Sequence, residues 1–479
     1  MLIEPRTHAQ RRGLARRVST PAAIVAGSVA LAALTLLLPS TPTYDPWAWI
    51  IWGREITELD LDTVDGPSWK PLPVMFTTVF ALAGDGAAPD LWLVVARAGA
   101  IAGVAAAFLL ARRLAGTVAG VAAAAALALA PWWVRNGALG NSEGLLVALL
   151  FAAILAHLDR RRGWAFALGL AVGLLRPEAW PFVGLYALWL LYEERSRLPW
   201  AAAGLVSLPV LWLGPELWGS GNALRASDRA QQPNPDSPAF AEHPALEVVD
   251  NAFAMIPWAA VAGAAALLLL VALRRAPAGR GRLAIGLVAM AAAWIGLVAL
   301  MTSSGFSGNT RYLMPPASLL IVLGAAGAVW AVAAVAAAWP RRPRGAATTA
   351  VAALAAAAAF ALQDAHEVPD QVRGVRYQAE LADGLPRVIE KAGGVARLRA
   401  CGHAYTNPYL VPQVAWHLGV HSQQVDLDPD EERPAVVFHV KHVSSARGRA
   451  PAWALRGRNE LARDGTWIVT ADCHPGAGR

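Results

Sequence analysis

The chain has 479 residues, of which 56% are hydrophobic and only 16% are charged. An ordinary soluble domain carries about a quarter charged residues, so this composition excludes a single soluble globule. The formal net charge of +7 does not predict a nucleic-acid partner, because the arginines lie in short clusters between apolar blocks and the sequence has no nucleotide-binding loop or nucleic-acid module. We therefore expect a mostly α, polytopic membrane protein.

About eleven apolar blocks are candidate transmembrane helices, judged against the ~30 Å thickness of the hydrocarbon core. They cover residues 21–39, 91–111, 114–131, 144–157, 164–175, 179–192, 199–214, 253–273, 283–301, 313–338 and 346–362. Arginine clusters lie in alternate turns, at 112–113, 160–162, 195–197, 274–282 and 341–344. Because cytoplasmic loops carry the excess of arginine, we expect a multi-pass plasma-membrane protein with a cytoplasmic N-terminus.

Three long segments then lie on the outer face, and the last of them forms a separate domain. They are a first loop at about 40–90, a middle loop at 215–252 and the tail 363–479, which follows a transmembrane domain at 1–362. Within the tail, 375–394 is predicted to be a helix, and 395–402, 435–440 and 466–473 are predicted to be strands of a small α/β domain. Its Cys401 and Cys473 are predicted to form a disulfide in an oxidising compartment.

Two apolar segments are too short to cross a bilayer as straight helices. Residues 71–84 are predicted to form an interfacial helix on the outer face. The blocks 164–175 and 179–192 meet at "LLRPEAW", where Arg176 and Glu178 flank Pro177. Charged, proline-broken backbone at membrane depth is tolerated where protein buries it or where it lines a wet cavity.

The stretch "YDPWAWIIWGREI", at 44–56, directly follows the first candidate span. One interpretation is an aromatic belt, in which Trp47, Trp49 and Trp52 anchor the loop at the membrane interface. The other is an active-site carboxylate, Asp45, held against the outer leaflet. Further ionisable residues occur in the other outer segments, and their one-sided distribution favours a site there.

Four short motifs in order resemble the GT-C superfamily of membrane glycosyltransferases. They are "YDPW" after the first span, then "GPSWKPLPV", "LLRPEAW" and "GNTRYLMPP" before a late span. The Lys-Pro and Arg-Tyr-x-x-Pro elements are similar to those of the protein mannosyltransferase and aminoarabinose transferase branch, although this chain has "KPLP" where that branch has "KPP". The resemblance covers about the first 340 residues. It implies an enzyme that transfers a sugar from a polyprenyl-phosphate donor to a cell-envelope glycan, lipid or protein.

The residue types suit this chemistry. Asp45 is predicted to accept the proton of the acceptor hydroxyl as a general base, and one displacement assisted by one carboxylate implies inversion at the anomeric carbon. The groups predicted to hold the donor phosphate are Lys70, Arg176, Arg311 and Tyr312. The residues predicted to position the substrates are Trp47, Arg54, Glu55, Glu143 and Glu178.

These residues also have structural interpretations. Asp45 could cap a helix or pair with Arg54, and Arg176 with Glu178 could be a buried structural pair. Lys70 and Arg311 could extend to the lipid headgroups, while Tyr312 could be a belt anchor.

No cofactor is required by the predicted reaction, but Asp60 and Asp62 have the spacing of a carboxylate pair that could hold Mg²⁺ or Mn²⁺. The alternative is a solvated acidic loop.

The sequence leaves two other functions open. A transporter or lipid flippase would need charges near the bilayer midplane, where Arg97 is the candidate. A non-catalytic scaffold of the cell envelope would need no catalytic residues.

Overall fold

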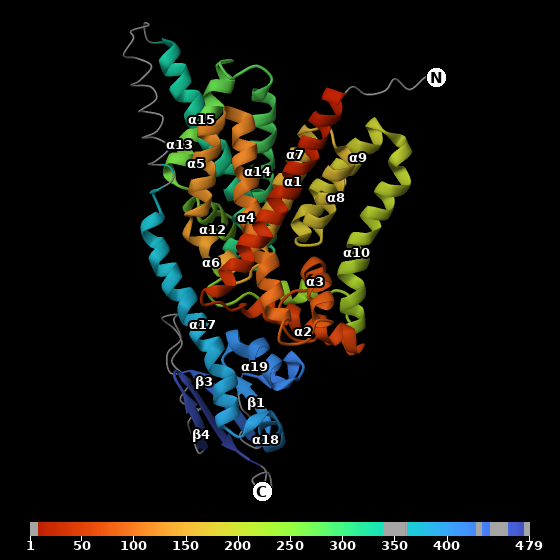
Figure 1. Ribbon diagram of the computed structural model, residues 1–479, viewed down its shortest axis with the longest axis vertical. Helices are drawn as coiled ribbons and strands as arrows, with labels where there is room; N and C mark the ends of the chain where they lie inside the picture. Colours follow the sequence, from red (N-terminus) through yellow and green to blue (C-terminus); the bar gives the residue numbers. More distant parts are fainter. Residues whose placement is uncertain (1–7, 339–359, 361, 428–433, 441–457, 474–479) are drawn as a thin grey trace.

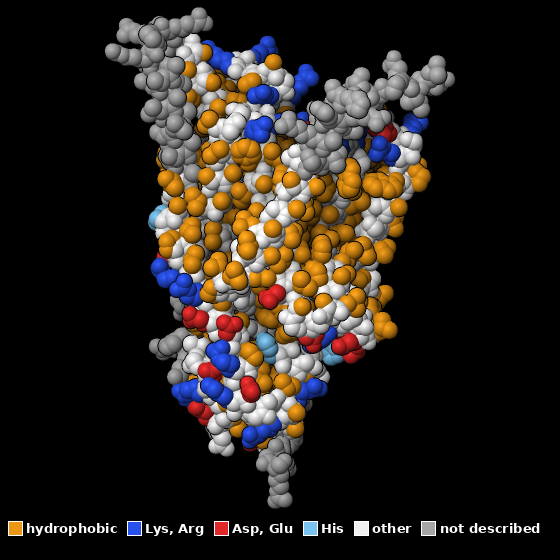
Figure 2. Space-filling model, viewed as in Figure 1, with side chains coloured by type: hydrophobic (Ala, Val, Ile, Leu, Met, Phe, Trp, Pro, Cys, Tyr) orange, Lys and Arg blue, Asp and Glu red, His pale blue; other side chains and the backbone are white. Residues whose placement is uncertain are grey.

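The computed structural model describes residues 8–338, 360, 362–427, 434–440 and 458–473. A long helical bundle carries a small α/β domain at one end (Figure 1). On the face shown in Figure 2, a broad band of hydrophobic side chains covers the bundle, and Lys and Arg side chains lie beyond it, both at the end opposite the α/β domain and on the α/β domain itself. This is the architecture that the composition predicts.

The bundle is built from long apolar helices joined by short helices and turns. Its helices are α1 (His8–Leu34), α2 (Tyr44–Glu58), α3 (Pro71–Ala81), α4 (Ala88–Ala115), α5 (Thr117–Ala128), α6 (Pro131–Ala138), α7 (Glu143–Leu158), α8 (Arg162–Gly173), α9 (Trp180–Glu193), α10 (Leu198–Ser220), α11 (Arg225–Ala230), α12 (Pro244–Ala254), α13 (Trp258–Ala272), α14 (Arg280–Ser303) and α15 (Met314–Ala338). Among the described residues, five helical segments are long and apolar enough to cross a membrane, or up to seven if each of two bent helix pairs is one span. The chain is therefore a multi-pass membrane protein.

The predicted apolar blocks from 21–39 to 313–338 all fall on helices, whereas most of 346–362 lies outside the described residues. The expected break between 164–175 and 179–192 is present. There α8 and α9 have 12 and 14 residues, separated by the short 3₁₀ helix η2 (Pro177–Ala179). Segment 71–84 forms α3, which packs on α2 near the α/β domain (Figure 1).

Three of the arginine-rich turns meet at the end of the bundle that is far from the α/β domain. Arg113, at the end of α4, pairs with Asp159 after α7 at 2.5 Å. Arg280, at the start of α14, donates to the Leu114 carbonyl oxygen at 3.0 Å. Three of the five arginine clusters that define the predicted cytoplasmic side are thus neighbours in space.

The α/β domain contains α17 (Val368–Lys391), α18 (Gly394–Cys401), α19 (Val411–Leu418) and a five-stranded sheet of order β2-β1-β3-β5-β4. The strands are β1 (His403–Thr406), β2 (Val425–Asp426), β3 (Ala435–Val440), β4 (Asn459–Asp464) and β5 (Trp467–Asp472). β1 is parallel to β2 and β3, whereas β5 is antiparallel to β3 and β4. The predicted strands at 435–440 and 466–473 are confirmed.

The strand predicted at 395–402 is wrong, because this segment forms α18. Val395, Leu398 and Cys401 recur every three residues, which is the spacing of one helix face rather than of a strand. Leu398 and Cys401 are buried on that face. The strand begins only at His403, after Gly402.

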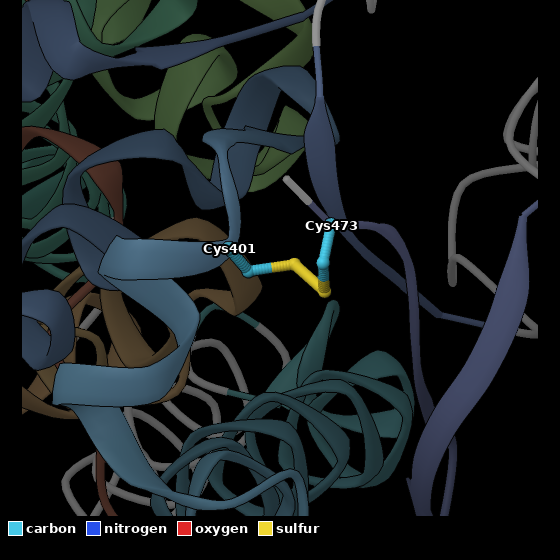
Figure 3. Close-up of a disulfide and its surroundings, with 2 residues drawn as sticks. All are labelled: Cys401 and Cys473. Carbon is cyan, nitrogen blue, oxygen red and sulfur yellow. A yellow bond between two sulfur atoms is a disulfide. The ribbon is translucent and has the colours of Figure 1, made fainter. Parts of the chain in front are cut away.

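A disulfide joins the end of α18 to the residue that follows β5. The sulfur atoms of Cys401 and Cys473 are 2.08 Å apart (Figure 3). The bond closes a sequence separation of 72 residues, for which chain entropy alone predicts a stabilisation of about 4 kcal/mol. It therefore joins the two ends of the chain segment that builds the sheet.

The tryptophans of α2 are core residues, so the aromatic-belt interpretation is wrong for them. Trp49 and Trp52 are fully buried and Trp47 is only 5% exposed. The reason is that α2 is covered on one side by the bundle and on the other by α19 of the α/β domain (Figure 1). The Trp52 indole N–H donates to the Asp62 carbonyl oxygen at 2.9 Å.

Candidate active site

The candidate site lies where several helices begin, at the end of the bundle that carries the α/β domain. Asp45 is in the first turn of α2, Lys70 directly precedes α3, and Glu143 is the first residue of α7. Arg176 precedes η2, and Arg311 lies in the 3₁₀ helix η5 (Thr310–Leu313) before α15. Helices remote in sequence thus bring five predicted site residues to one place.

Local sequence explains why the cations lie at helix starts. Lys70 and Arg176 each precede a proline, Pro71 and Pro177, that occupies the first turn of a helix. Proline is tolerated there because its missing N–H would have no helical partner, and it restricts the preceding residue to extended backbone. Lys70 (φ −138°, ψ 112°) and Arg176 (φ −147°, ψ 122°) have that conformation.

The inner part of the site is a buried carboxylate shared by two cations. Glu143 is fully buried, and Lys70 and Arg176 are each only 5% exposed. The Lys70 Nζ lies 3.5 Å from Glu143 Oε1, and Arg176 forms an ion pair with the same oxygen. Lys70 also donates to the Ser142 hydroxyl at 3.3 Å.

Three buried atoms of this inner part have no hydrogen-bond partner in the described structure. They are Glu143 Oε2, Arg176 Nε and Glu178 Oε2. Buried polar atoms are almost always paired, because an unmade bond costs about 1–3 kcal/mol. An unpaired guanidinium N–H beside Lys70 is therefore a ready donor to an anionic ligand.

The outer part of the site is an ion pair between Asp45 and Arg311. The Arg311 Nη1 lies 3.0 Å from Asp45 Oδ2, and the two side chains are 25% and 14% exposed, respectively. Arg311 also donates to Asn141 Oδ1 at 3.1 Å, and the same oxygen accepts from the Thr43 hydroxyl at 3.2 Å. The partner of Asp45 is thus Arg311 rather than Arg54.

Aromatic rings pack against the two inner cations. The Lys70 Nζ is 4.9 Å from the ring centroid of Trp49, and the Arg176 Cζ is 4.2 Å from that of Tyr312. The Tyr312 hydroxyl, predicted to hold phosphate, lies 3.0 Å from the Ser307 hydroxyl. Rings at these distances stabilise the charge and orient the side chain.

Burial affects the charge of Lys70, which lies in a loop outside the candidate spans. Loss of water and the repulsion of the nearby Arg176 guanidinium lower the pKa of Lys70 to about 8, despite the attraction of Glu143. The ammonium ion is thus present at neutral pH and is close to its titration range.

The other predicted residues of the first loop face the α/β domain instead. These are Trp47, Arg54, Glu55, Asp60 and Asp62. Asp60 lies 3.3 Å from His421 Nε2, and Asp62 accepts from the Gln423 side chain. No group of three or more metal-type ligands occurs among the described residues, so the predicted carboxylate pair has no third protein ligand there.

Sequence reasoning missed Asn141 and Ser142, which directly precede Glu143. Asn141 bridges Thr43 and Arg311, and Ser142 accepts from Lys70. Their position directly before α7 could have indicated them, because Asn and Ser are typical residues at the start of a helix.

Arg97, the embedded charge that favours a transporter, makes structural contacts. Its guanidinium donates to the Thr35 carbonyl and hydroxyl oxygens, both at 3.1 Å, to the Ser40 hydroxyl at 2.9 Å and to the Ala138 carbonyl at 2.7 Å. These bonds fasten the segment that follows α1 to the end of α6, so the position of Arg97 does not indicate a transport pathway.

No family model and no curated protein matches this chain. The solved structures that resemble it include two that match it over almost its whole length. ArnT from Cupriavidus metallidurans in the apo state has a TM-score of 0.59 and 16% identity, covering 95% of this chain and 98% of that one. ArnT from the same organism bound to undecaprenyl phosphate has a TM-score of 0.58 and 15% identity, covering 94% and 97%. The chain therefore has the polytopic membrane fold of ArnT, in agreement with the mostly α, multi-pass architecture that the sequence predicts.

Proposed function

We propose that this protein is an outward-facing membrane glycosyltransferase. It takes a sugar from a polyprenyl-phosphate donor and transfers it, with inversion, to a hydroxyl of a cell-envelope glycan, lipid or protein. The observation that carries the proposal is the cluster in which three cations, Lys70, Arg176 and Arg311, surround the carboxylates Glu143 and Asp45 at one end of the bundle. That one ArnT structure holds undecaprenyl phosphate supports a lipid phosphate as ligand of this fold.

The cations suit a phosphate that gains charge as it leaves. Lys70 and Arg176 share one carboxylate, and Arg176 Nε has no partner in the described structure. Burial strengthens their attraction for a phosphate, because little water screens it. With this fixed charge the reaction needs no divalent cation, and a cation at Asp60 and Asp62 is not part of the proposed mechanism.

Asp45 is the proposed base, and its pairing with Arg311 links it to donor binding. When a donor phosphate contacts Arg311, it competes with Asp45 for the same guanidinium. Asp45 then accepts the proton of the acceptor hydroxyl while that oxygen bonds to the anomeric carbon. The bond from that carbon to the phosphate oxygen breaks, its electron pair stays on the phosphate, and Lys70 and Arg176 stabilise the charge.

The test is the transfer rate of Asp45→Asn, which keeps the size of the side chain and removes its ability to accept a proton. We expect normal membrane insertion, retained binding of undecaprenyl phosphate, and turnover about 10²- to 10⁴-fold lower, the usual contribution of a positioned base. Purified protein would be assayed with polyprenyl-phosphate sugars and envelope acceptors.

Asp85→Asn is the matched control, since Asp85 is an exposed residue between α3 and α4. It should transfer like the wild type. Wild-type turnover in Asp45→Asn would exclude Asp45 as the base. A wild-type protein that transfers no sugar, but moves a labelled lipid across vesicles, would establish a flippase instead.

A further inference from the structure

The helix that carries Asp45 is held between the bundle and the α/β domain. On the bundle side, the Thr77 hydroxyl of α3 donates to the Trp49 carbonyl oxygen at 2.6 Å. The rings of Trp49 and Trp92 pack edge to face, with centroids 5.3 Å apart. This face of α2 is therefore fixed to the membrane domain.

Trp416 of α19 contacts the opposite face of α2. Its ring centroid lies 6.0 Å from that of Trp47 and 4.9 Å from the Arg54 Cζ. Arg54 also donates to the Val420 carbonyl oxygen at 3.3 Å. Trp47 and Trp416 are 5% and 9% exposed, so this contact is closely packed and holds α2 at both its first and its third turn.

His421, just beyond α19, adds polar contacts to the same face. Its Nδ1 lies 2.7 Å from Glu55 Oε1, and Glu55 is only 1% exposed. The other carboxylate oxygen of Glu55 accepts from the Asp62 backbone N–H at 3.0 Å. Glu55 thus joins three segments: α2, the loop that follows it and the α/β domain.

We propose that Trp416 and His421 are positioning residues for catalysis: by docking on α2 they keep Asp45 at Arg311. This inference rests on the proposed function. Trp47 is two residues from Asp45, so a shift of α2 away from α19 moves the first turn and the carboxylate together. A misplacement of about 1 Å lowers the reaction rate by on the order of 10²-fold. This docking is therefore a determinant of turnover.

Docking should affect turnover more than donor binding. Lys70 and Arg176 are on other elements, and their ion pairs with Glu143 involve neither α2 nor α19, so the affinity for undecaprenyl phosphate should change little. We expect Trp416→Leu and Arg54→Ala to lower kcat about 10- to 100-fold. Trp416→Phe keeps an aromatic ring against Trp47 and should retain most of the wild-type kcat.

The contacts of His421 have a matched control within the same domain. His403 pairs with Asp426 at 2.9 Å, and both residues belong to the α/β domain. We expect His421→Ala to lower kcat and His403→Ala to leave it unchanged, although each removes one histidine–carboxylate contact. His421→Gln retains a donor for Glu55 and should restore most of the activity.

Hydrogen exchange of the full-length protein provides a readout that does not depend on transfer. The backbone amides of α2 should exchange at least tenfold faster in Trp416→Leu and His421→Ala than in the wild type, while Asp45→Asn should keep wild-type protection. Unchanged protection of α2 in both docking variants would overturn the proposal. So would faster exchange with wild-type kcat, because α2 would then be loosened without affecting catalysis.

Failure of the proposed function has a different signature. In that case the wild type and every variant would show no sugar transfer, while exchange would still report whether α19 protects α2. A role in positioning Asp45 for catalysis would then be excluded, even with the docking itself intact.

Discussion

Lys70 is a cation whose charge depends on its surroundings. It is buried against Trp49, its Nζ lies 3.5 Å from Glu143 Oε1, and the neighbouring Arg176 repels it. Burial and that repulsion lower the pKa of Lys70 to about 8. Since the lysine is charged below its pKa, most of the positive charge available for a donor phosphate is present at neutral pH and is lost as the pH rises through about 8.

We therefore predict an alkaline limb in kcat/KM for the donor, which reports the ionisation of the free enzyme. Transfer should decline above about pH 8 in the wild type. Lys70→Arg places a guanidinium with a pKa above 12 at the same position, so its decline should begin at higher pH, although its neutral-pH rate falls because the geometry differs. An identical alkaline limb in Lys70→Arg would assign the ionisation to another group.

The residues of the site were predictable to different extents. Lys70 and Arg176 could be identified because each precedes a proline at a helix start, a pattern visible in the sequence. The pairing of Asp45 with Arg311 could not be derived, because Arg54 is nearer along the chain. Arg54 and Glu55 were predicted to position substrate, whereas they contact Trp416 and His421 of the α/β domain. Such long-range contacts leave no local signal.

At the scale of elements, glycines allow α13 and α15 to approach closely. A Cβ atom on Gly263 would lie 2.1 Å from the Gly324 carbonyl oxygen, and one on Gly327 would lie 1.9 Å from the Gly263 carbonyl oxygen. Small residues at such spacings are typical of helix pairs in membranes, where dispersion contacts between backbones replace a hydrophobic driving force. Because η5 with Arg311 directly precedes α15, this helix pair also supports the site.

Replacing either α15 glycine should separate the two helices. We expect Gly327→Val and Gly324→Val each to destabilise the protein by about 1–3 kcal/mol or more, the usual cost of overpacking a close contact. The measurement is the melting temperature in detergent. Gly296→Val on α14 is the matched control, since a Cβ there meets no atom within 4 Å. Equal melting temperatures for the α15 variants and the control would show that this close approach does not limit stability.

The elements themselves were predicted best where the physics is local. Long apolar blocks gave helices because a bilayer requires about 20 apolar residues and internal hydrogen bonds. The helix α18 was mistaken for a strand because its apolar residues are few and short periods are ambiguous. The burial of α2 was also missed, since Trp49 and Trp52 suit an aromatic belt as well as a core, and only the presence of α19 decides between them.

At the scale of the whole molecule, charge is distributed asymmetrically along the bundle. The arginine-rich turns lie at one end, while the candidate site and the α/β domain lie at the other (Figure 1, Figure 2). The contact between Arg113 and Asp159 links two of those turns. On the positive-inside rule we propose that the arginine-rich end is cytoplasmic and that the site and the disulfide-bonded domain face the outside. A lipid-linked donor suits that side, where a sugar must arrive on a membrane carrier.

This orientation predicts the labelling pattern of two single-cysteine positions. Ser196, in the arginine-rich turn before α10, and Ser304, directly after α14, are both exposed. The native Cys401 and Cys473 are bonded to each other and should not react with a maleimide. In intact cells a membrane-impermeant maleimide should label Ser304→Cys and leave Ser196→Cys unlabelled, whereas permeabilised cells should show both labelled. Labelling of Ser196→Cys alone in intact cells would reverse the orientation, and would place the cation cluster on the cytoplasmic side, where an outward-facing transferase cannot work.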